Sequence, residues 1–269
     1  MRAQHFILFI VFLVQHSFAQ DLSFQWGIPC DSLSIWSVDN LNNLIVQENG
    51  TLSKYSSKGQ KTYEQSIKQT GDFSSIDGGN GLKIGGFSTE QQQICFFDNT
   101  LTLQNECVDL SDFEITTATA FCMSEQTDKF WVYDEMKSEL SLMTLRTNQQ
   151  QKLDNIRNLS TLKEVVRITE FNNQLFLFDR NHILVIDIFG SFLKDLEIDL
   201  TGILDFQISD EFIYLLKRDH TFEAVNLITL DRFPINFTIK EAQRFVFKNG
   251  FFYFQSTNQI DCYEVIIKN

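Results

Sequence analysis

An apolar pair recurs along the chain at nearly constant spacing. The two residues of each pair stand three positions apart, and successive pairs begin 38 to 46 residues apart. The six pairs are Leu52/Tyr55, Ile94/Phe97, Leu140/Met143, Ile183/Ile186, Phe222/Val225 and Ile260/Tyr263. A repeat of about 40 residues built from short apolar strands is typical of one blade of a β-propeller. The pattern therefore predicts an all-β, six-bladed propeller.

Within each repeat, a short apolar run precedes a polar tip and the apolar pair. Runs such as 44–46, 130–133, 175–178, 212–215 and 251–254 are apolar at both residue parities, which suits strands buried on both faces. The tip Asn49-Gly50 predicts a tight hairpin, because both residues tolerate positive φ. The 27 Phe residues would fill the wedges between blades. The stretch 153–165 fits either a helix or a connection between blades.

The second repeat is the most divergent, since it holds Gly78, Gly79, Gly81, Gly85 and Gly86. These glycines are compatible with a bulge, with close approach of a partner, or with drift in a peripheral loop.

The two ends of the chain complement each other. The sixth repeat has room for only three strands before Asn269, and the extended segment 22–26 precedes the first repeat. If this segment pairs into the last blade, the ring closes and two exposed sheet edges disappear. We therefore predict closure by the N-terminal strand.

The first 19 residues have the pattern of an export signal. Arg2 supplies a positive charge, 6–14 are uninterruptedly apolar, and Ser17 and Ala19 are small residues before a cleavage site. Nine apolar residues are too few to span a bilayer core of about 30 Å. We expect a signal peptide over 1–19, a single propeller domain over 20–269, and a periplasmic protein without a membrane anchor.

The charge balance disfavours whole classes of partner. The sequence has 22 Lys and Arg against 35 Asp and Glu, for a net charge of −13. An acidic protein without a basic stripe repels the phosphates of nucleic acids and anionic membrane surfaces. In an exported protein the acidic excess commonly serves solubility.

Five cysteines suggest one disulfide. Cys95 and Cys107 lie on either side of a polar turn near residue 100, so folding that hairpin brings them together. Cys30, Cys122 and Cys262 have no evident mates, and we expect them to be buried as small apolar residues.

The fourth repeat carries a resemblance to a known family. Its segment Phe178-Asp179-Arg180-Asn181-His182-Ile183-Leu184-Val185-Ile186-Asp187-Ile188-Phe189-Gly190 resembles the blade pattern of NHL-type and TolB-like six-bladed propellers, in which an apolar strand ends in Asp-x-x-Gly. The match departs at Thr229 in repeat five and at Leu101 in repeat two. That family includes interaction platforms, lactone hydrolases and lyases, so the resemblance implies the fold and no single activity. The composition, rich in Asn, Gln and Phe and poor in Pro, resembles that of exported Bacteroidota proteins.

Two polar tips on adjacent repeats are the candidate binding surface. They carry Arg180 with His182 and Arg218 with His220, and together could form a cationic rim patch suited to a carboxylate or an acidic loop. The alternative is that they are ordinary turn residues. Two histidines without a third ligand fall short of a zinc site, so we expect no metal there.

The sequence shows no catalytic constellation and implies no cofactor. Nucleophile-elbow and phosphate-loop motifs are missing. Propeller hydrolases hold calcium in the channel through acidic side chains on the innermost strands. The segments expected to be innermost, 35–38, 165–168 and 206–208, contain Arg167 and Gln207 but no ring of acids. Asp39, Asp77, Asp205 and Asp210 fit better as turn residues than as ligands.

The leading hypothesis is a non-enzymatic periplasmic interaction module. It resembles the propeller accessory subunits of outer-membrane assembly or secretion machines, of which the type IX translocon is one. Two alternatives stay open: a calcium-dependent hydrolase or lyase, and a propeller that binds a small ligand or glycan on Trp36 and Trp131, although both tryptophans also suit a core.

Overall fold

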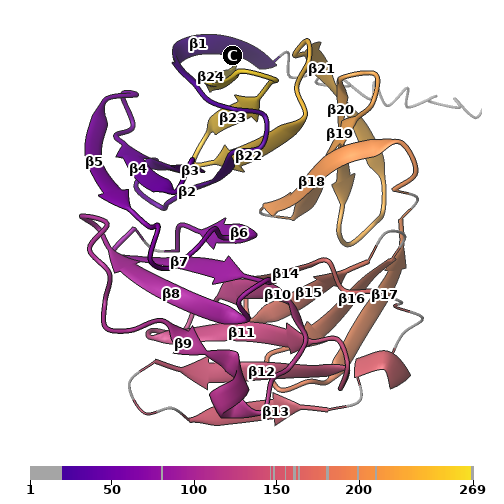
Figure 1. Ribbon diagram of the computed structural model, residues 1–269. Coiled ribbons are helices and arrows are strands. Elements are labelled where there is room, and N and C mark those ends of the chain that lie inside the picture. The colour runs from indigo at the N-terminus through magenta and orange to yellow at the C-terminus, as the bar shows by residue number, and fades with distance from the viewer. Residues whose placement is uncertain are drawn as a thin grey trace, which may run out of the picture.

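The computed structural model describes residues 20–79, 81–145, 147, 149–154, 156–159, 162, 164–179, 182–198, 200–209 and 211–267. In this part of the chain the strands form six four-stranded antiparallel sheets around a common centre (Figure 1). The predicted six-bladed β-propeller is confirmed. The expected signal peptide, 1–19, lies outside the described residues.

Blades 1 to 3 each begin with the innermost strand and proceed outward. Blade 1 contains β2 (Ile35–Val38), β3 (Leu44–Glu48), β4 (Thr51–Tyr55) and β5 (Lys61–Ser66). Blade 2 contains β6 (Ser75–Asp77), β7 (Lys83–Ser88), β8 (Gln93–Asp98) and β9 (Val108–Asp109), followed by the 3-10 turn η1 (Leu110–Phe113). Blade 3 contains β10 (Ala118–Met123), β11 (Lys129–Asp134), β12 (Glu139–Thr144) and β13 (Gln150–Leu153).

Blades 4 to 6 follow the same order. Blade 4 contains β14 (Arg167–Phe171), β15 (Gln174–Phe178), β16 (His182–Asp187) and β17 (Phe192–Glu197). Blade 5 contains β18 (Ile203–Ser209), β19 (Phe212–Lys217), β20 (Thr221–Asn226) and β21 (Arg232–Thr238). Blade 6 contains β22 (Arg244–Lys248), β23 (Phe251–Gln255), β24 (Gln259–Ile267) and, outermost, β1 (Gln20–Pro29).

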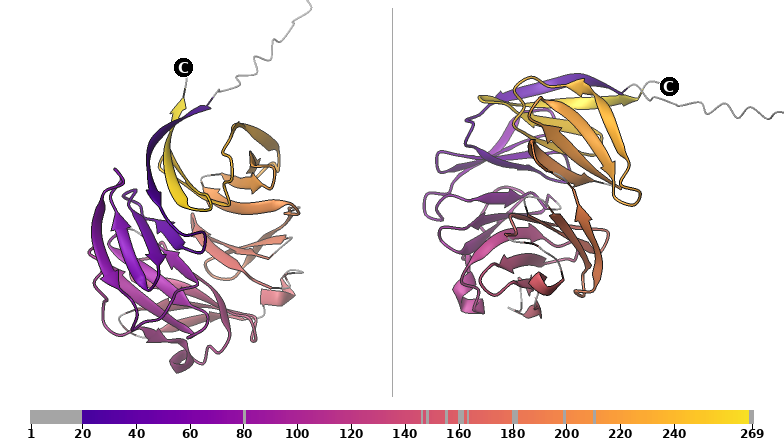
Figure 2. Two further views of the ribbon diagram at one scale, coloured as in Figure 1. Left: turned by 45° about the horizontal axis from the view of Figure 1, so that its top comes forward. Right: turned by 90° about the vertical axis from the view of Figure 1, so that its right-hand side faces the viewer.

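The N-terminal strand closes the ring, as predicted. The register of β1 against β24 runs from Gln20↔Ile267 to Pro29↔Gln259, with an irregularity between Phe24 and Trp26. In Figure 1 the indigo β1 lies directly beside the yellow β24, and both views of Figure 2 keep them together. The closure joins segments at least 230 residues apart in sequence, and it completes the last blade of the ring.

Local turn chemistry sets the strand registers. Asn49 and Gly50 have φ of 51° and 70°, and they join β3 to β4 with Glu48 opposite Thr51. Asn172 and Asn173 have φ of 51° and 57° and join β14 to β15 in the same way. Two consecutive positive φ values match the twist of a two-residue hairpin. The predicted Asn49-Gly50 hairpin is therefore confirmed.

Hydrophobic clusters fill the interfaces between neighbouring blades. The interface of blades 3 and 4 holds Trp131, fully buried, with Leu175 and Leu177. The interface of blades 5 and 6 is aromatic, because Phe222 packs against Phe245, Phe252 and Phe254. Since each aromatic side chain buries about 150–250 Å², these wedges hold the blades in place. The predicted role is confirmed for these buried Phe residues, whereas Phe24, Phe189, Phe192 and Phe233 are exposed.

The glycines of β7 permit close packing of two phenylalanines. A Cβ at Gly85 would lie 2.5 Å from Cζ of Phe121, and a Cβ at Gly86 would lie 2.6 Å from the ring of Phe73. Both glycines pair regularly with β6 and β8, so they mark neither a bulge nor a loop. The divergent sequence of blade 2 at these positions is a packing feature.

We expect Gly86→Ala to destabilise the protein by about 1–3 kcal/mol, because a methyl group must displace the Phe73 ring in a filled core. Chemical denaturation measures the change. The matched control is Gly250→Ala, where nothing lies within 4 Å of the added Cβ and the cost is the positive φ of 81° alone. A loss at Gly86 no larger than the loss at Gly250 would contradict the packing argument.

Cysteine pairing follows the hairpin geometry of blade 2. Cys95 and Cys107 form a disulfide across 12 residues, with their Cα atoms 4.2 Å apart. Cys30, Cys122 and Cys262 are free and buried, as predicted. Burial raises the pKa of Cys30 to about 11 and that of Cys262 to about 12. These thiols therefore stay protonated at neutral pH.

Helical structure is scarce in the described part of the chain. In the described part of 153–165, Leu153 ends β13 and the 3-10 turn η2 (Ile156–Asn158) follows between blades 3 and 4, which agrees with the second of the two predicted alternatives. Of the residues described, none belongs to a helix long and apolar enough to cross a membrane.

Candidate functional site

The innermost strands of all six blades surround a central channel of about 550 Å³. Its lining is drawn from β2, β6, β10, β14, β18 and β22. Because each blade contributes its innermost strand in the same direction, one end of the channel gathers the starts of these strands and the other gathers their ends. A concave site shared by all blades is the natural place to look for a ligand.

Two arginines stand where the inner strands begin. Arg167 is the first residue of β14 and Arg244 the first of β22. Nη2 of Arg167 lies 3.0 Å from Oδ1 of Asp205, while Oδ2 of Asp205 accepts a 2.9 Å bond from the amide of Phe245. One carboxylate thus serves both an arginine and the neighbouring blade. We call this end, with Arg167 and Arg244, the arginine end.

Arg244 has no carboxylate partner among the described residues. Its guanidinium lies 5.5 Å from the ring centre of Trp36, a cation–π arrangement. Burial lowers the pKa of Arg244, the nearby charge of Asp205 opposes this, and that of Arg167 adds to it. An arginine stays charged under such conditions. The arginine end therefore holds two positive groups and one negative group.

The opposite end of the channel has a different balance. Lys248 ends β22, and burial lowers its pKa while the charges of Asp77 and Asp39 oppose that change. Nζ of Lys248 donates to the carbonyl of Val38 at 3.4 Å. Asp77 is fully engaged, since its two oxygens accept from the amides of Gly79 and Met123, both at 2.8 Å.

Glu170 is the acid in the channel wall with a free oxygen. Its side chain is buried at 8% exposure, and Oε2 accepts a 2.6 Å bond from Nε1 of Trp131. Oε1 is buried without a hydrogen-bond partner. A buried carboxylate oxygen without a donor is costly, so this atom marks a place where a ligand could donate.

The sequence-based view of the inner strands needs correction. We expected 165–168 to be the innermost segment of blade 4, but β14 spans Arg167–Phe171 and therefore includes Glu170. The Asn172-Asn173 turn sets this register, because it places Phe171 opposite Gln174. Asp205 was expected in a turn, yet it lies inside β18. Asp39 is a turn residue as expected. Asp77 is the last residue of β6, and its side chain accepts from the amide of Gly79 in the turn that follows. Asp210 lies outside the described residues.

Sequence reasoning missed Arg244, Lys248 and Glu170 as channel residues. Arg244 and Lys248 flank the apolar run Phe245–Phe247 in the innermost strand of blade 6. Charged residues at both ends of an innermost strand were therefore the available signal. Glu170 gave no comparable signal, because its place depends on the register of β14.

Cysteine chemistry in the channel is disfavoured by burial. Cys122 lines the channel and is 5% exposed. Burial raises its pKa, and the charges of Asp77 and Glu170 add to this effect. Since the thiolate is the reactive form, Cys122 is a packing residue here.

The two predicted rim tips, with His182 and with His220, do not contact each other in the described structure. His182 begins β16, with its amide bonded to Oδ1 of Asp179 and its Nδ1 3.7 Å from Oδ2 of the same residue. His220 precedes β20, and its Nδ1 lies 3.1 Å from the carbonyl of Ala242. Arg218 is exposed in the same turn as His220. No described contact joins His182 to His220, and Arg180 lies outside the described residues.

Exposed apolar side chains gather on blades 4 and 5. The outer hairpins β16–β17 and β20–β21 carry six exposed large apolar residues: Phe189, Phe192, Leu193, Ile228, Leu230 and Phe233. Beside them a groove of about 210 Å³ lies between the blades, lined by Phe171, Phe176, Val185, Leu196, Leu227 and Ile228 together with polar residues. Lys194 of β17 bonds the carbonyl of Leu227, so the two hairpins are neighbours. We call this surface the apolar flank.

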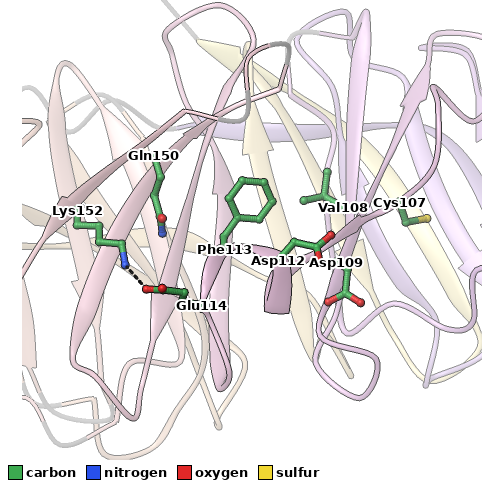
Figure 3. Close-up of a pocket in the computed structure, with 8 residues that line it drawn as sticks. All are labelled: Cys107, Val108, Asp109, Asp112, Phe113, Glu114, Gln150 and Lys152. Carbon is green, nitrogen blue, oxygen red and sulfur yellow. Dashed lines mark ion pairs between the residues drawn. The ribbon is translucent and has the colours of Figure 1, made fainter.

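A second hollow, of about 620 Å³, lies at the outer edge of blades 2 and 3. It exists because β9 has only two residues. Figure 3 shows the ion pair of Lys152 and Glu114 on one side of this hollow. Asp109 and Asp112 lie on the other side. Asp109 caps η1 by accepting from the amide of Ser111. Of the three acidic residues that line the hollow, Asp109 and Glu114 therefore already have structural partners. We regard this cleft as a consequence of the short edge strand.

Trp36 and Trp131 are core residues. Their side chains are 2% and 0% exposed. Nε1 of Trp36 donates to Oε1 of Gln255 at 2.6 Å, as Nε1 of Trp131 does to Glu170. Neither ring offers a free face as a stacking platform for a glycan. Within the described ranges, no group of three or more His, Cys, Asp or Glu side chains is placed to hold a metal ion.

The comparisons with known proteins support the fold. No protein-family model and no curated protein matches the sequence. Solved propellers do match: a streptogramin B lyase (16% identity, TM-score 0.57, covering 86% of this chain and 78% of that one) and the Pan2 WD40 domain of Neurospora crassa (8%, 0.65, 93% and 97%). A catalytically inactive virginiamycin B lyase from Staphylococcus aureus, solved with quinupristin, also matches (11%, 0.60, 93% and 100%).

These likenesses define the class of the protein. It is a β-propeller similar in architecture both to lyases and to a WD40 domain. At 8–16% identity they establish a shared architecture, and function has to be argued from this chain's own surfaces.

Proposed function

We propose that the protein is a non-enzymatic interaction module that docks on a partner protein through the apolar flank of blades 4 and 5. The observation that carries the proposal is the concentration of exposed apolar side chains there. Phe189 is 75% exposed, Ile228 68% and Phe192 49%. Contiguous exposed apolar surface on an otherwise acidic protein marks an interaction site.

The shape of the flank suits a protein partner. The groove beside Ile228 is apolar at its base and has Lys194 and Glu211 in its wall. An apolar centre with a polar edge is the usual anatomy of a protein–protein interface. Large aromatic side chains in such a position dominate binding energy.

The same proposal includes the cellular location of the protein and the larger assembly to which it belongs. The leader pattern of 1–19 and the composition support export to the periplasm of a Bacteroidota-type cell, and the NHL-type resemblance of 178–190 supports a propeller of that group. We propose an accessory subunit of an outer-membrane assembly or secretion machine, for which the type IX translocon is one setting. The rim patch with Arg180, His182, Arg218 and His220 is the alternative docking surface.

Site-specific photo-crosslinking in the native cell tests the docking surface. We expect a photoreactive residue at position 189 or 228 to give one discrete adduct with one protein, because these side chains would be covered in the complex. The matched controls are positions 33 and 41, where Leu33 and Leu41 are 84% and 61% exposed on blade 1. The double variant Phe192→Asp/Ile228→Asp should weaken partner binding at least 10-fold and leave the thermal midpoint nearly unchanged.

Other crosslinking patterns overturn the proposal. An adduct at position 218 with none at 189 or 228 would assign docking to the rim. Equal adducts at 33, 41, 189 and 228 would show non-specific contact.

A further inference from the structure

The central channel contains an arginine without an ion-pair partner and a carboxylate oxygen without a hydrogen-bond donor among the described residues. Arg244 at the arginine end faces the ring of Trp36 and has no ion-pair partner in the described structure. Oε1 of Glu170 is buried without a donor. Both residues line the same cavity of about 550 Å³. Buried charges are normally paired, because removing a charge from water without compensation is costly.

The two charges do not neutralise each other. Arg244 begins β22 and Glu170 is the next-to-last residue of β14, so they come from different blades and stand toward opposite ends of the channel. The groups that already have partners cannot supply the missing contacts. Asp205 holds Arg167 and the amide of Phe245, and Asp77 holds the amides of Gly79 and Met123.

Strand β14 gives the length of a ligand that would reach from the arginine end to Glu170. The Cα atoms of Arg167 and Glu170 are three residues apart on this strand, which corresponds to about 10 Å at 3.3 Å per residue. An extended tripeptide has a similar length, about 10 Å from its amine to its carboxylate. The arginine end offers guanidinium groups, which bind a carboxylate well. The Glu170 oxygen offers an acceptor for an ammonium or amide donor.

We propose that the channel binds a small zwitterionic molecule, such as a short peptide, with its carboxylate at Arg167 and Arg244 and its amine toward Glu170. The apolar wall to which Ile76, Ile168 and Ile208 contribute would contact the middle of the ligand. This site lies inside the ring and is separate from the apolar flank, so the two proposals stand or fall independently.

Calorimetric titration of the full-length mature protein with trialanine tests the proposal. N-acetyl-trialanine removes the positive end of the probe, and trialanine amide removes the negative end. We expect saturable binding of trialanine and at least 10-fold weaker binding of either blocked form. Glu170→Gln should abolish the preference for the free amine, and Arg244→Gln should abolish the preference for the free carboxylate.

Controls keep the result specific. Arg218→Gln removes an exposed arginine outside the channel and should leave the affinity for trialanine unchanged. Thermal melts of each variant establish that it is folded before its affinity is compared. The proposal is wrong if trialanine does not bind saturably, or if the blocked probes bind as well as trialanine. It is also wrong if only the carboxylate matters, because the site would then be a simple anion site.

Discussion

Deleting residues 20–29 should abolish the cooperative unfolding transition of the protein. β1 is the fourth strand of blade 6, and without it β24 loses its outer partner along its whole length. The strand also connects two blades. Nε1 of Trp26 donates to the carbonyl of Ser57 in blade 1 at 2.9 Å, and its ring contacts Tyr253 of blade 6 at 5.9 Å. Its removal therefore opens the ring and exposes an apolar sheet edge, which favours aggregation.

Circular dichroism during thermal melting, together with size-exclusion chromatography, measures this effect. We expect a broad transition and aggregation for the truncated chain. Adding a synthetic peptide of residues 20–29 in excess should restore a cooperative transition, whereas a scrambled peptide of the same composition should not. A truncated protein that melts like the intact one would show that the other five blades suffice.

Replacing Asp39 with Ala should destabilise the protein by about 3–5 kcal/mol, the usual cost of breaking a buried ion pair. Oδ2 of Asp39 lies 3.2 Å from Nζ of Lys54, and the two side chains are 0% and 5% exposed. The carboxylate also accepts from the amides of Leu41 and Asn43, both at 2.8 Å. The substitution would leave the buried ammonium of Lys54 without its carboxylate. It would also remove the side-chain hydrogen bonds that hold the turn between β2 and β3.

Urea denaturation with matched variants separates these contributions. Lys54→Met combined with Asp39→Ala should recover part of the loss, because no charge is then buried alone. The control is Glu64→Ala, which breaks the exposed pair with Lys61 and should cost much less than Asp39→Ala. If Asp39→Ala and Glu64→Ala cost the same, the buried pair is not an important support of blade 1.

The architecture could be predicted because each blade repeats a local pattern. Spacing of the apolar pairs identified six blades, and the three strands available after residue 244 indicated that the segment near Phe24 completes the last one. These inferences need only strand periodicity and the avoidance of free edges. Turn residues such as Asn49 and Gly50 follow local rules as well.

The channel was harder to predict because its chemistry comes from separate blades. One cavity is lined by Arg167, Asp205 and Arg244, each about 40 residues from the next in sequence, and Arg167 bonds Asp205 there. Nothing in the local sequence indicates that they share a cavity. Glu170 was missed because the expected innermost segment ended at residue 168, three residues before the end of β14 at Phe171. The role of Gly85 and Gly86 was ambiguous from the sequence. These positions need glycine because Phe121 and Phe73, from other parts of the chain, pack against them.

The apolar flank also depends on tertiary structure. Phe189 and Ile228 belong to turns, in which single apolar residues are common and need no explanation. Only the ring places their two hairpins next to each other, with Lys194 bonded to Leu227 across the gap. The sequence therefore indicated a binding module and pointed to the polar rim, whereas the structure adds exposed apolar side chains on two neighbouring hairpins.

Hydrogen–deuterium exchange of the full-length protein, alone and within its complex isolated from the cell envelope, tests the docking claim most directly. We predict slower exchange in the complex at β17 and β21 and in the turns that precede them, with β5 and β13 unchanged. Protection confined to blades 1 to 3, or to the rim turn that carries Arg218 and His220, would contradict the assignment of docking to the apolar flank.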